Sequence, residues 1–294
     1  MQLQVQLLTL GVTKGIIYGL IALGLVLVYK GTRVLNFAQP EIGVASVYVA
    51  YLVSGRAHAP YWLGALAALT FAITVGLLFE RLVVRQMAEA SRLSVAVATI
   101  ALFSLLLSGE LLIFGPSPYV LPDPVSGQGV DVGGVQILPV QLLSMVVLPV
   151  VCIALAAFLR YTDFGLGVLA AAQDSTAVRL VGVRLSRVSA FTWATASALS
   201  AVAALLIEPV ITVLAPGEIG TPLFVGGLAA ALVGGLSSLP GAIAGGLLVG
   251  ILEAEVTHYV TATTLRGAPT LAIFLVIVAF LVLRPQGLLA RSAA

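Results

Sequence analysis

Six ionisable side chains lie inside long apolar runs of this sequence, where a charge is costly. A charged side chain at the centre of a lipid bilayer costs about 2.5–3.5 kcal/mol on insertion scales. We therefore expect each of these residues to form a buried ion pair or to line a polar path for a solute. The residues are Lys14, Glu41, Glu110, Glu208, Glu253 and Glu255.

Glu41 differs from the others because Asn36, Gln39 and Pro40 precede it at the start of an expected helix. A carboxylate in a first helical turn interacts with free N–H groups and with the positive end of the helix dipole. Glu41 can therefore cap a broken helix, or it can line the path of a solute. The sequence leaves both interpretations open.

The composition indicates that nearly all of the chain lies in a membrane. Of the 294 residues, 60% are hydrophobic and only 9% are charged, with a formal net charge of +2. A soluble domain carries about 25% charged residues because its surface must face water. This composition excludes a soluble enzyme, a coiled coil and a disordered scaffold, and the chain has no basic block for nucleic acid. Cys152 is the single cysteine, so no disulfide or thiol-based metal site is expected within the chain.

About 20 mostly apolar residues cross the hydrocarbon core as one helix. We therefore expect an all-α, polytopic helix bundle with eight or nine spans, forming one transmembrane domain over residues 1–294. Three of these spans, 40–54, 223–236 and 241–260, are short or interrupted by glycine and proline, which predicts half-helices or re-entrant segments. The expected spans are 8–29, 40–54, 61–80, 93–114, 138–159, 188–214, 223–236, 241–260 and 269–284.

Arginines in the connecting segments predict the orientation. Segments 81–92 and 160–187 each hold several arginines, whereas 115–137 has no Lys or Arg. Basic loops stay in the cytoplasm, so 115–137 is expected outside. The N-terminus is then outside if 40–54 crosses fully, and inside if 40–54 is re-entrant.

The segment 160–187 is longer than an ordinary connection between helices. Its apolar residues, beginning at Phe164, recur with helical spacing. Asp174 and Ser175 can cap a second short helix, and Gly182 can end it. Such a hairpin can dock a partner protein or simply lie on lipid headgroups, and the pattern alone favours neither.

Glycines recur at a spacing of four residues in two regions, at Gly11, Gly15 and Gly19 and again from Gly241 to Gly250. Small residues at this spacing let helix backbones approach closely in lipid. The broken segments 36–54 and 234–250 also take corresponding places in the two halves, which is typical of an internal repeat around a midplane pathway. We expect 36–43 and 234–241 to face each other across that pathway.

Four segments carry a family likeness. Asn36-Phe37-Ala38-Gln39-Pro40-Glu41 resembles the N-F-A-H-G-E string of bacterial ABC-transporter permeases for branched-chain amino acids, with Gln39-Pro40 in place of His-Gly. The hairpin from Gln173 to Arg187 resembles that family's cytoplasmic loop, with Ala177, Val178 and Gly182 at the matching spacing. The stretch 232–242 resembles its G-G-x-G-S-x-P-G-A signature, and 284–289 fits its closing P-x-G-L/I-L.

The resemblance implies a permease subunit of an ATP-driven importer in the bacterial inner membrane, with an inverted repeat like that of type II ABC importers. Its implied partners are a second permease copy or paralogue, two cytoplasmic ATPase subunits and a periplasmic solute-binding protein. No G-x-x-x-x-G-K-[ST] motif is present, so ATP and Mg²⁺ are expected on the partner ATPases and no cofactor on this chain. The implied translocation-path residues are Asn36, Gln39, Glu41, Gly43, Gly234, Gly235, Ser237, Pro240 and Gly241. The implied ATPase-docking residues are Asp174, Ser175, Ala177, Val178, Arg179, Gly182 and Arg184.

The main alternative is a self-contained secondary carrier or channel. A carrier needs a coupling-ion site, and Glu110 and Glu253 are candidates for it. An intramembrane enzyme is the least supported class, because neither H-E-x-x-H nor G-x-S-x-G occurs. The sequence does not identify the transported solute.

Overall fold

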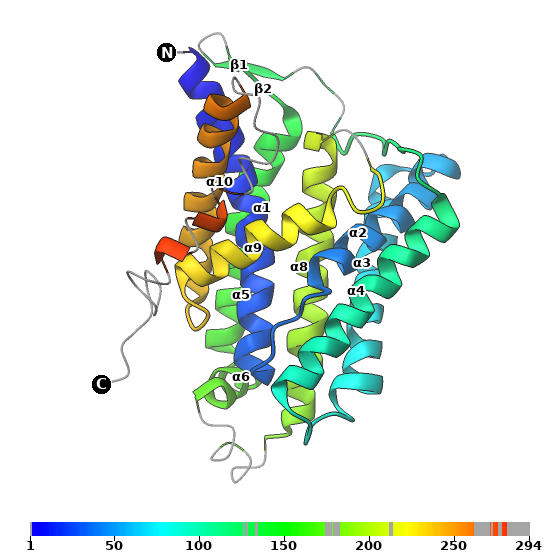
Figure 1. Cartoon of the computed structure of the whole chain (residues 1–294), viewed down its shortest axis with the longest axis vertical. Coiled ribbons are helices and arrows are strands. Elements are labelled where there is room, and N and C mark those ends of the chain that lie inside the picture. The colour runs from blue at the N-terminus through cyan, green and yellow to red at the C-terminus, as the bar shows by residue number, and fades with distance from the viewer. Residues whose placement is uncertain are drawn as a thin grey trace.

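The chain folds as a bundle of long helices (Figure 1). The computed structural model describes residues 2–125, 127, 129–132, 135–173, 178, 183–211, 214–261, 271, 273–275 and 278–280. Among these residues, six helices are long and apolar enough to cross a membrane, so the expected multi-pass membrane protein is confirmed. The six run over Leu3–Thr32, Tyr61–Val84, Arg92–Phe114, Pro139–Tyr161, Leu185–Ile211 and Leu239–Tyr259.

Helix α1 (Gln2–Thr32) lies at the centre of the bundle, packed against α8 (Leu185–Ile211), α9 (Gly220–Gly234) and α10 (Leu239–Thr261). It is apolar around its whole circumference, which is the pattern of a helix with no solvent-facing side. Residues 16–28 of α1 are accordingly buried. The core of the molecule therefore forms around this one helix.

The outer helices expose apolar side chains instead of polar ones. They are α3 (Tyr61–Phe79), α4 (Arg92–Phe114) and α5 (Pro139–Tyr161), and a π-helical turn, η2 (Glu80–Val84), extends α3. Leu105 is 68% exposed, Leu112 86% and Ile153 69%. Large exposed apolar surfaces mark contact with lipid or with another apolar protein, so α3, α4 and α5 form an outer, membrane-embedded side of the bundle.

Two expected spans are short helices in the interior. The first, 40–54, is α2 (Gln39–Ala50) with the π-helical turn η1 (Tyr51–Arg56), and the second, 223–236, is α9. Helix α2 follows a non-helical stretch at 34–38, and α9 crosses the middle of the bundle obliquely (Figure 1). The expected span 269–284 lies largely outside the described residues.

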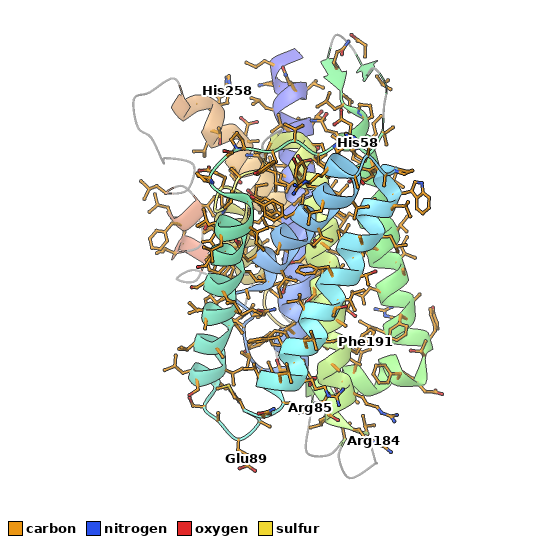
Figure 2. All side chains as sticks on the ribbon, turned by 90° about the vertical axis from the view of Figure 1, so that its right-hand side faces the viewer. His58, Arg85, Glu89, Arg184, Phe191 and His258 are labelled. Carbon is orange, nitrogen blue, oxygen red and sulfur yellow. The ribbon has the colours of Figure 1, made fainter. Side chains whose placement is uncertain are left out.

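The two ends of the bundle differ in the way the loop charges predict. Arg85, Glu89 and Arg184 lie at one end, and His58 and His258 at the other (Figure 2). The N-terminal end of α1 lies at the second end, together with the strands (Figure 1). The described residues of segments 81–92 and 160–187 therefore share one end of the bundle, opposite those of 115–137.

The expectation of an all-α fold needs one correction. Strands β1 (Val130–Val132) and β2 (Val135–Ile137) form an antiparallel hairpin with Val130 opposite Ile137. β-Branched residues alternate with polar residues in both strands, at Val130, Val132, Val135 and Ile137, and this pattern favours a strand pair. The rest of the described chain is helical or irregular apart from the bridge between Tyr119 and Leu214.

Candidate translocation site

Three other helices hold the beginning of α2 in place. The Gln39 side chain donates to the Ile21 carbonyl oxygen of α1 at 2.9 Å, and the Ser200 hydroxyl of α8 donates to the Gln39 carbonyl oxygen at 2.7 Å. The Phe37 N–H donates to the Thr99 hydroxyl of α4 at 3.1 Å. A helix that starts inside the bundle leaves free backbone groups, and these bonds satisfy part of that need.

Asn36 and Gly43 shape the same segment. The Asn36 side-chain oxygen accepts from the Ala38 N–H at 3.1 Å, which forms the turn into α2. A Cβ on Gly43 would overlap the Ser200 carbonyl oxygen, so this glycine permits the close contact between α2 and α8. Asn36 and Gln39 are both completely buried.

Glu41 is completely buried, and its carboxylate points at the start of α9. A Cβ on Gly220, the first residue of α9, would overlap one Glu41 oxygen and lie 2.9 Å from its carboxyl carbon. Neither Glu41 oxygen has a hydrogen-bond partner among the described residues. Glu41 therefore does not cap α2 by a hydrogen bond, although it lies near the positive ends of both α2 and α9.

Glu110 of α4 and Tyr48 of α2 lie where these two helices meet. The Tyr48 and Phe114 ring centroids are 4.5 Å apart, and Glu110 precedes Phe114 by one helical turn. Glu110 is 4% exposed and Tyr48 1%. The Tyr48 hydroxyl and both Glu110 oxygens also lack hydrogen-bond partners in the described part of the chain.

The second expected path segment, 234–241, does not meet the first. Gly234 and Gly241 contact each other across the turn between α9 and α10, where Gly235 has a φ of 95° that favours glycine. Ser237 lies in this turn, and its carbonyl oxygen accepts from Lys30 of α1 at 3.0 Å. Segment 36–43 instead contacts the start of α9, where the Phe37 and Phe224 ring centroids are 5.3 Å apart. The two segments therefore lie at opposite ends of α9.

Pro40 and Pro240 occupy equivalent positions in their helices. Each is the second residue of its helix, α2 and α10 respectively, where a missing N–H removes no intrahelical hydrogen bond. The Ser238 hydroxyl accepts from the Gly241 N–H at 3.0 Å and so begins α10. Nearby residues therefore determine both helix starts: a proline at the second position of each helix, and a capping serine before α10.

Most of the other ionisable residues in the spans have structural partners. Lys14 forms an ion pair with Glu253 at 2.8 Å, and the Tyr18 hydroxyl donates to the second Glu253 oxygen in a short hydrogen bond. Glu208 accepts from the Leu121 N–H at 3.2 Å. These contacts join α1 to α10 and α8 to an outer loop, so we assign structural roles to Lys14, Glu253 and Glu208.

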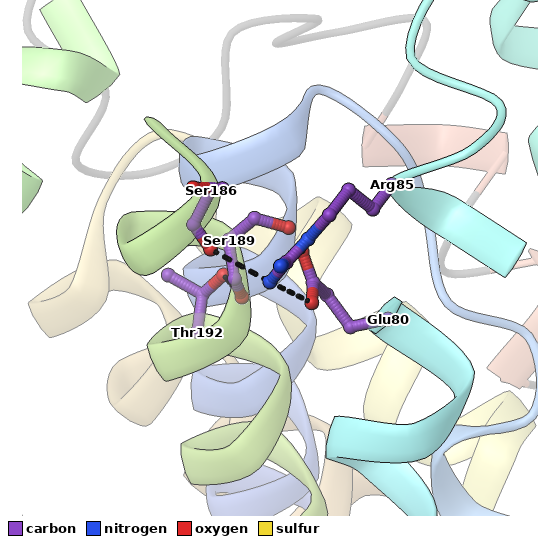
Figure 3. A network of polar contacts seen from close by, with 5 residues as sticks. All are labelled: Glu80, Arg85, Ser186, Ser189 and Thr192. Atoms are coloured by element: carbon purple, nitrogen blue, oxygen red, sulfur yellow. Dashed lines mark hydrogen bonds and ion pairs between the residues drawn. The ribbon is translucent and has the colours of Figure 1, made fainter. Parts of the chain in front are cut away.

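Glu80 and Arg85 link the segment 81–92 to α8 (Figure 3). Arg85 donates to Glu80 at 2.8 Å and to the Ser186 carbonyl oxygen at 3.4 Å. The Glu80 side chain is 1% exposed and the Arg85 side chain 43% exposed. The buried carboxylate therefore depends on a half-exposed arginine for its charge balance.

We expect Arg85→Gln to destabilise the protein, because it leaves the buried Glu80 carboxylate without its cation. An unsatisfied buried polar group costs about 1–3 kcal/mol. The thermal unfolding midpoint of the detergent-solubilised protein measures the effect. Arg81→Gln is the control, since Arg81 is an exposed neighbour. An equal loss in both variants would contradict the assignment.

The predicted docking segment contains a helix packed on α5 and α8. Helix α6 (Asp163–Gln173) follows Thr162, which caps it: the Thr162 hydroxyl accepts from the Gly165 N–H at 2.9 Å. Its buried face joins Val168 to Val178 and Val188 in one apolar cluster. Arg184 is exposed. Asp174, Ser175, Ala177, Arg179 and Gly182 lie outside the described residues.

Sequence reasoning did not single out Tyr48 or Phe114. Tyr48 follows Glu41 by seven residues and Phe114 follows Glu110 by four, so each aromatic lies on the same helical face as its carboxylate. The two rings are 4.5 Å apart between centroids. The helical spacing was a usable signal, but the contact between the two faces depends on how α2 and α4 pack.

A bundle of apolar helices with buried half-helices at its centre, and no nucleotide-binding loop in its sequence, is characteristic of a membrane permease. The chain belongs to the family described as "Branched-chain amino acid transport system / permease component", whose profile matches residues 7–283. The family resemblance of the sequence motifs is thereby confirmed. As a permease component, the chain is not itself an enzyme.

Curated relatives match almost the whole chain. It is 30% identical to the high-affinity branched-chain amino acid transport system permease protein LivH of Escherichia coli (strain K12), over 96% of this chain and 94% of that protein. It is 31% identical to the corresponding permease protein BraD of Pseudomonas aeruginosa, over 85% of each chain. It is 28% identical to the probable permease protein LivH of Methanocaldococcus jannaschii, over 82% of this chain and 77% of that protein.

Proposed function

We propose that this chain forms the translocation path for branched-chain or other hydrophobic amino acids in an ATP-driven importer of the bacterial inner membrane. The observation that carries the proposal is the similarity to permease proteins named for this transport, which extends over 96% of the chain. The helical architecture agrees, since long apolar helices surround the short buried helices α2 and α9. A periplasmic binding protein delivers the solute in this proposal.

The energy for transport comes from two partner ATPase subunits, which bind ATP and Mg²⁺, while this chain binds no cofactor. The segment 160–187 docks them. In support, α6 is packed on α5 and α8 at the end of the bundle that carries Arg85 and Arg184. A second permease, either a copy or a paralogue, completes the membrane part.

The path in this proposal runs along α2 and the α9–α10 turn, and includes the nine predicted residues from Asn36 to Gly241. Helices α2 and α9 both begin inside the bundle after non-helical segments, and their N-terminal ends meet at Glu41 and Gly220. This arrangement supports an inverted internal repeat. In this proposal α2 and α9 bring the six long helices to eight spans in one domain over residues 1–294, and segment 269–284 is the ninth.

Reconstitution with the genomic neighbours tests the function. The chain is co-purified with its ATPase, partner permease and binding protein, inserted into proteoliposomes and assayed for uptake of labelled L-leucine. We expect uptake only with ATP and the binding protein. Uptake that persists when the ATPase is inactivated would favour the alternative of a self-contained carrier or channel.

The corner between α5 and α6 offers a matched test of docking. A Cβ on Gly165 would overlap the Phe158 carbonyl oxygen and lie 2.6 Å from the Leu159 Cα, whereas a Cβ on Gly167 would make an ordinary contact with Val183 at 3.6 Å. We expect Gly165→Ala to displace α6 and to lower leucine uptake and ATPase co-purification, because the overpacked contacts are with backbone. Gly167→Ala should behave like the wild type. Equal ATPase capture by both variants would contradict a docking role for α6.

A further inference from the structure

The interior of the bundle contains several side-chain oxygens that can accept hydrogen bonds but have no hydrogen-bond partner in the described chain. Five of these oxygens belong to Glu41, Glu110 and Tyr48, each at least nine-tenths buried, and the others are Gln39 Oε1 and Ser197 Oγ. Buried polar groups in native proteins almost always have partners, so each exception needs an explanation. Four of the five oxygens belong to carboxyl groups, and the partner that such a group needs is a donor or a cation.

The geometry places this acceptor group between α2 and α4. Glu41 and Tyr48 lie two turns apart on one face of α2, and Glu110 and Phe114 lie one turn apart on the facing side of α4. The Tyr48 and Phe114 rings are in contact, and Tyr51 and Tyr119 continue the aromatic group, with centroids 4.8 Å apart. The acidic pair therefore adjoins an aromatic wall.

Both basic side chains of α1, Lys14 and Lys30, already have partners. Lys14 binds Glu253, and Lys30 binds the Ser237 carbonyl oxygen. The third element that faces Glu41 is the start of α9, where Gly220 leaves room for the carboxylate. The positive end of α9 would also attract the carboxylate of a bound zwitterion.

We propose that Glu41 and Glu110 bind the ammonium group of the transported solute, with Tyr48 and Phe114 forming an aromatic wall around it. The solute class is a zwitterionic α-amino acid with an uncharged, apolar side chain. Carboxylates accept charge-assisted hydrogen bonds from an ammonium group, and aromatic faces attract the same cation. An apolar side chain packs against the rings. This inference rests on the proposed function and adds the residues that recognise the solute.

The test uses the reconstituted importer with its own wild-type binding protein and labelled L-leucine as the probe. The variants are Glu41→Gln, Glu110→Gln and the double variant, which remove charge and keep side-chain size. Glu208→Gln is the matched control, because Glu208 is an equally buried carboxyl that the Leu121 N–H already satisfies. Assembly, unfolding midpoint and binding-protein-stimulated ATP hydrolysis are measured in parallel.

We expect each single variant to lower leucine uptake about tenfold or more, since hydrogen bonds to charged groups contribute strongly. ATP hydrolysis and assembly should persist, and Glu208→Gln should transport normally. Unchanged uptake in the double variant, or an equal loss in Glu208→Gln, would overturn the inference. If Glu41→Gln does not assemble, Glu110→Gln on the other helix decides. A wild-type complex that takes up no leucine would instead overturn the proposed function, and the inference with it.

Discussion

Replacing Gly250 with alanine is expected to prevent α10 from packing against α1. A Cβ at this position would overlap the N and Cα atoms of Gly15 and lie 2.6 Å from the Gly11 carbonyl oxygen. All three contacts are with backbone, so no side chain can rotate away. Inserted core atoms typically cost 1–3 kcal/mol, and we expect about 3 kcal/mol or more here because two helix backbones must separate.

The loss is measured as the fall in the unfolding midpoint of the detergent-solubilised protein and in the yield of folded protein. Gly109→Ala in α4 makes the same chemical change where a new Cβ meets no described atom within 4 Å. Alanine is also the better helix former, so Gly109→Ala should be neutral or slightly stabilising. A normal midpoint for Gly250→Ala would show that α1 and α10 are not held this closely.

Removing Glu253 is the second change with a large expected effect. Glu253→Leu leaves the Lys14 ammonium and the Tyr18 hydroxyl without their acceptor. The two charged side chains are only 21% and 12% exposed. Breaking a fully buried ion pair by removing one partner costs about 3–5 kcal/mol. Lys14 and Glu253 are partly buried, so we expect a loss at the lower end of that range.

The double variant Lys14→Met with Glu253→Leu distinguishes the effect of losing the ion pair from the effect of losing side-chain packing. It removes both charges, so we expect it to recover much of the stability that Glu253→Leu loses. Glu255→Gln, two residues along α10, is the control. The single variant Lys14→Met completes the cycle. If its loss and that of Glu253→Leu simply add in the double variant, Lys14 and Glu253 do not interact.

Local patterns of the sequence predicted the features that depend on nearby residues. Long apolar runs predicted α1, α3, α4, α5, α8 and α10, because backbone groups in lipid must bond within their own segment. The expected spans 40–54 and 241–260 predicted the starts of α2 and α10 to within two residues. The helical spacing from Phe164 onward predicted α6. The apolar hairpin at β1 and β2 escaped this reasoning, since its strands are only three residues long.

The meeting of distant segments was not predictable in the same way. Lys14 and Glu253 are 239 positions apart, and no local rule pairs them. Segment 36–43 was expected to face 234–241, but it contacts the start of α9, because α9 crosses the bundle obliquely and presents its other end. The position of one oblique helix thus changed which residues form the candidate site.

By itself, the sequence determined that this protein is a helical membrane permease, because hydrocarbon demands apolar runs of a set length and the four family motifs occur in order along the chain. Only the tertiary structure decided which buried charges are satisfied. Glu253 and Glu208 have partners, whereas Glu41 and Glu110 come together with none in the described chain. The physical reason is that burial and pairing depend on helices that are distant in sequence and adjacent only in the folded bundle.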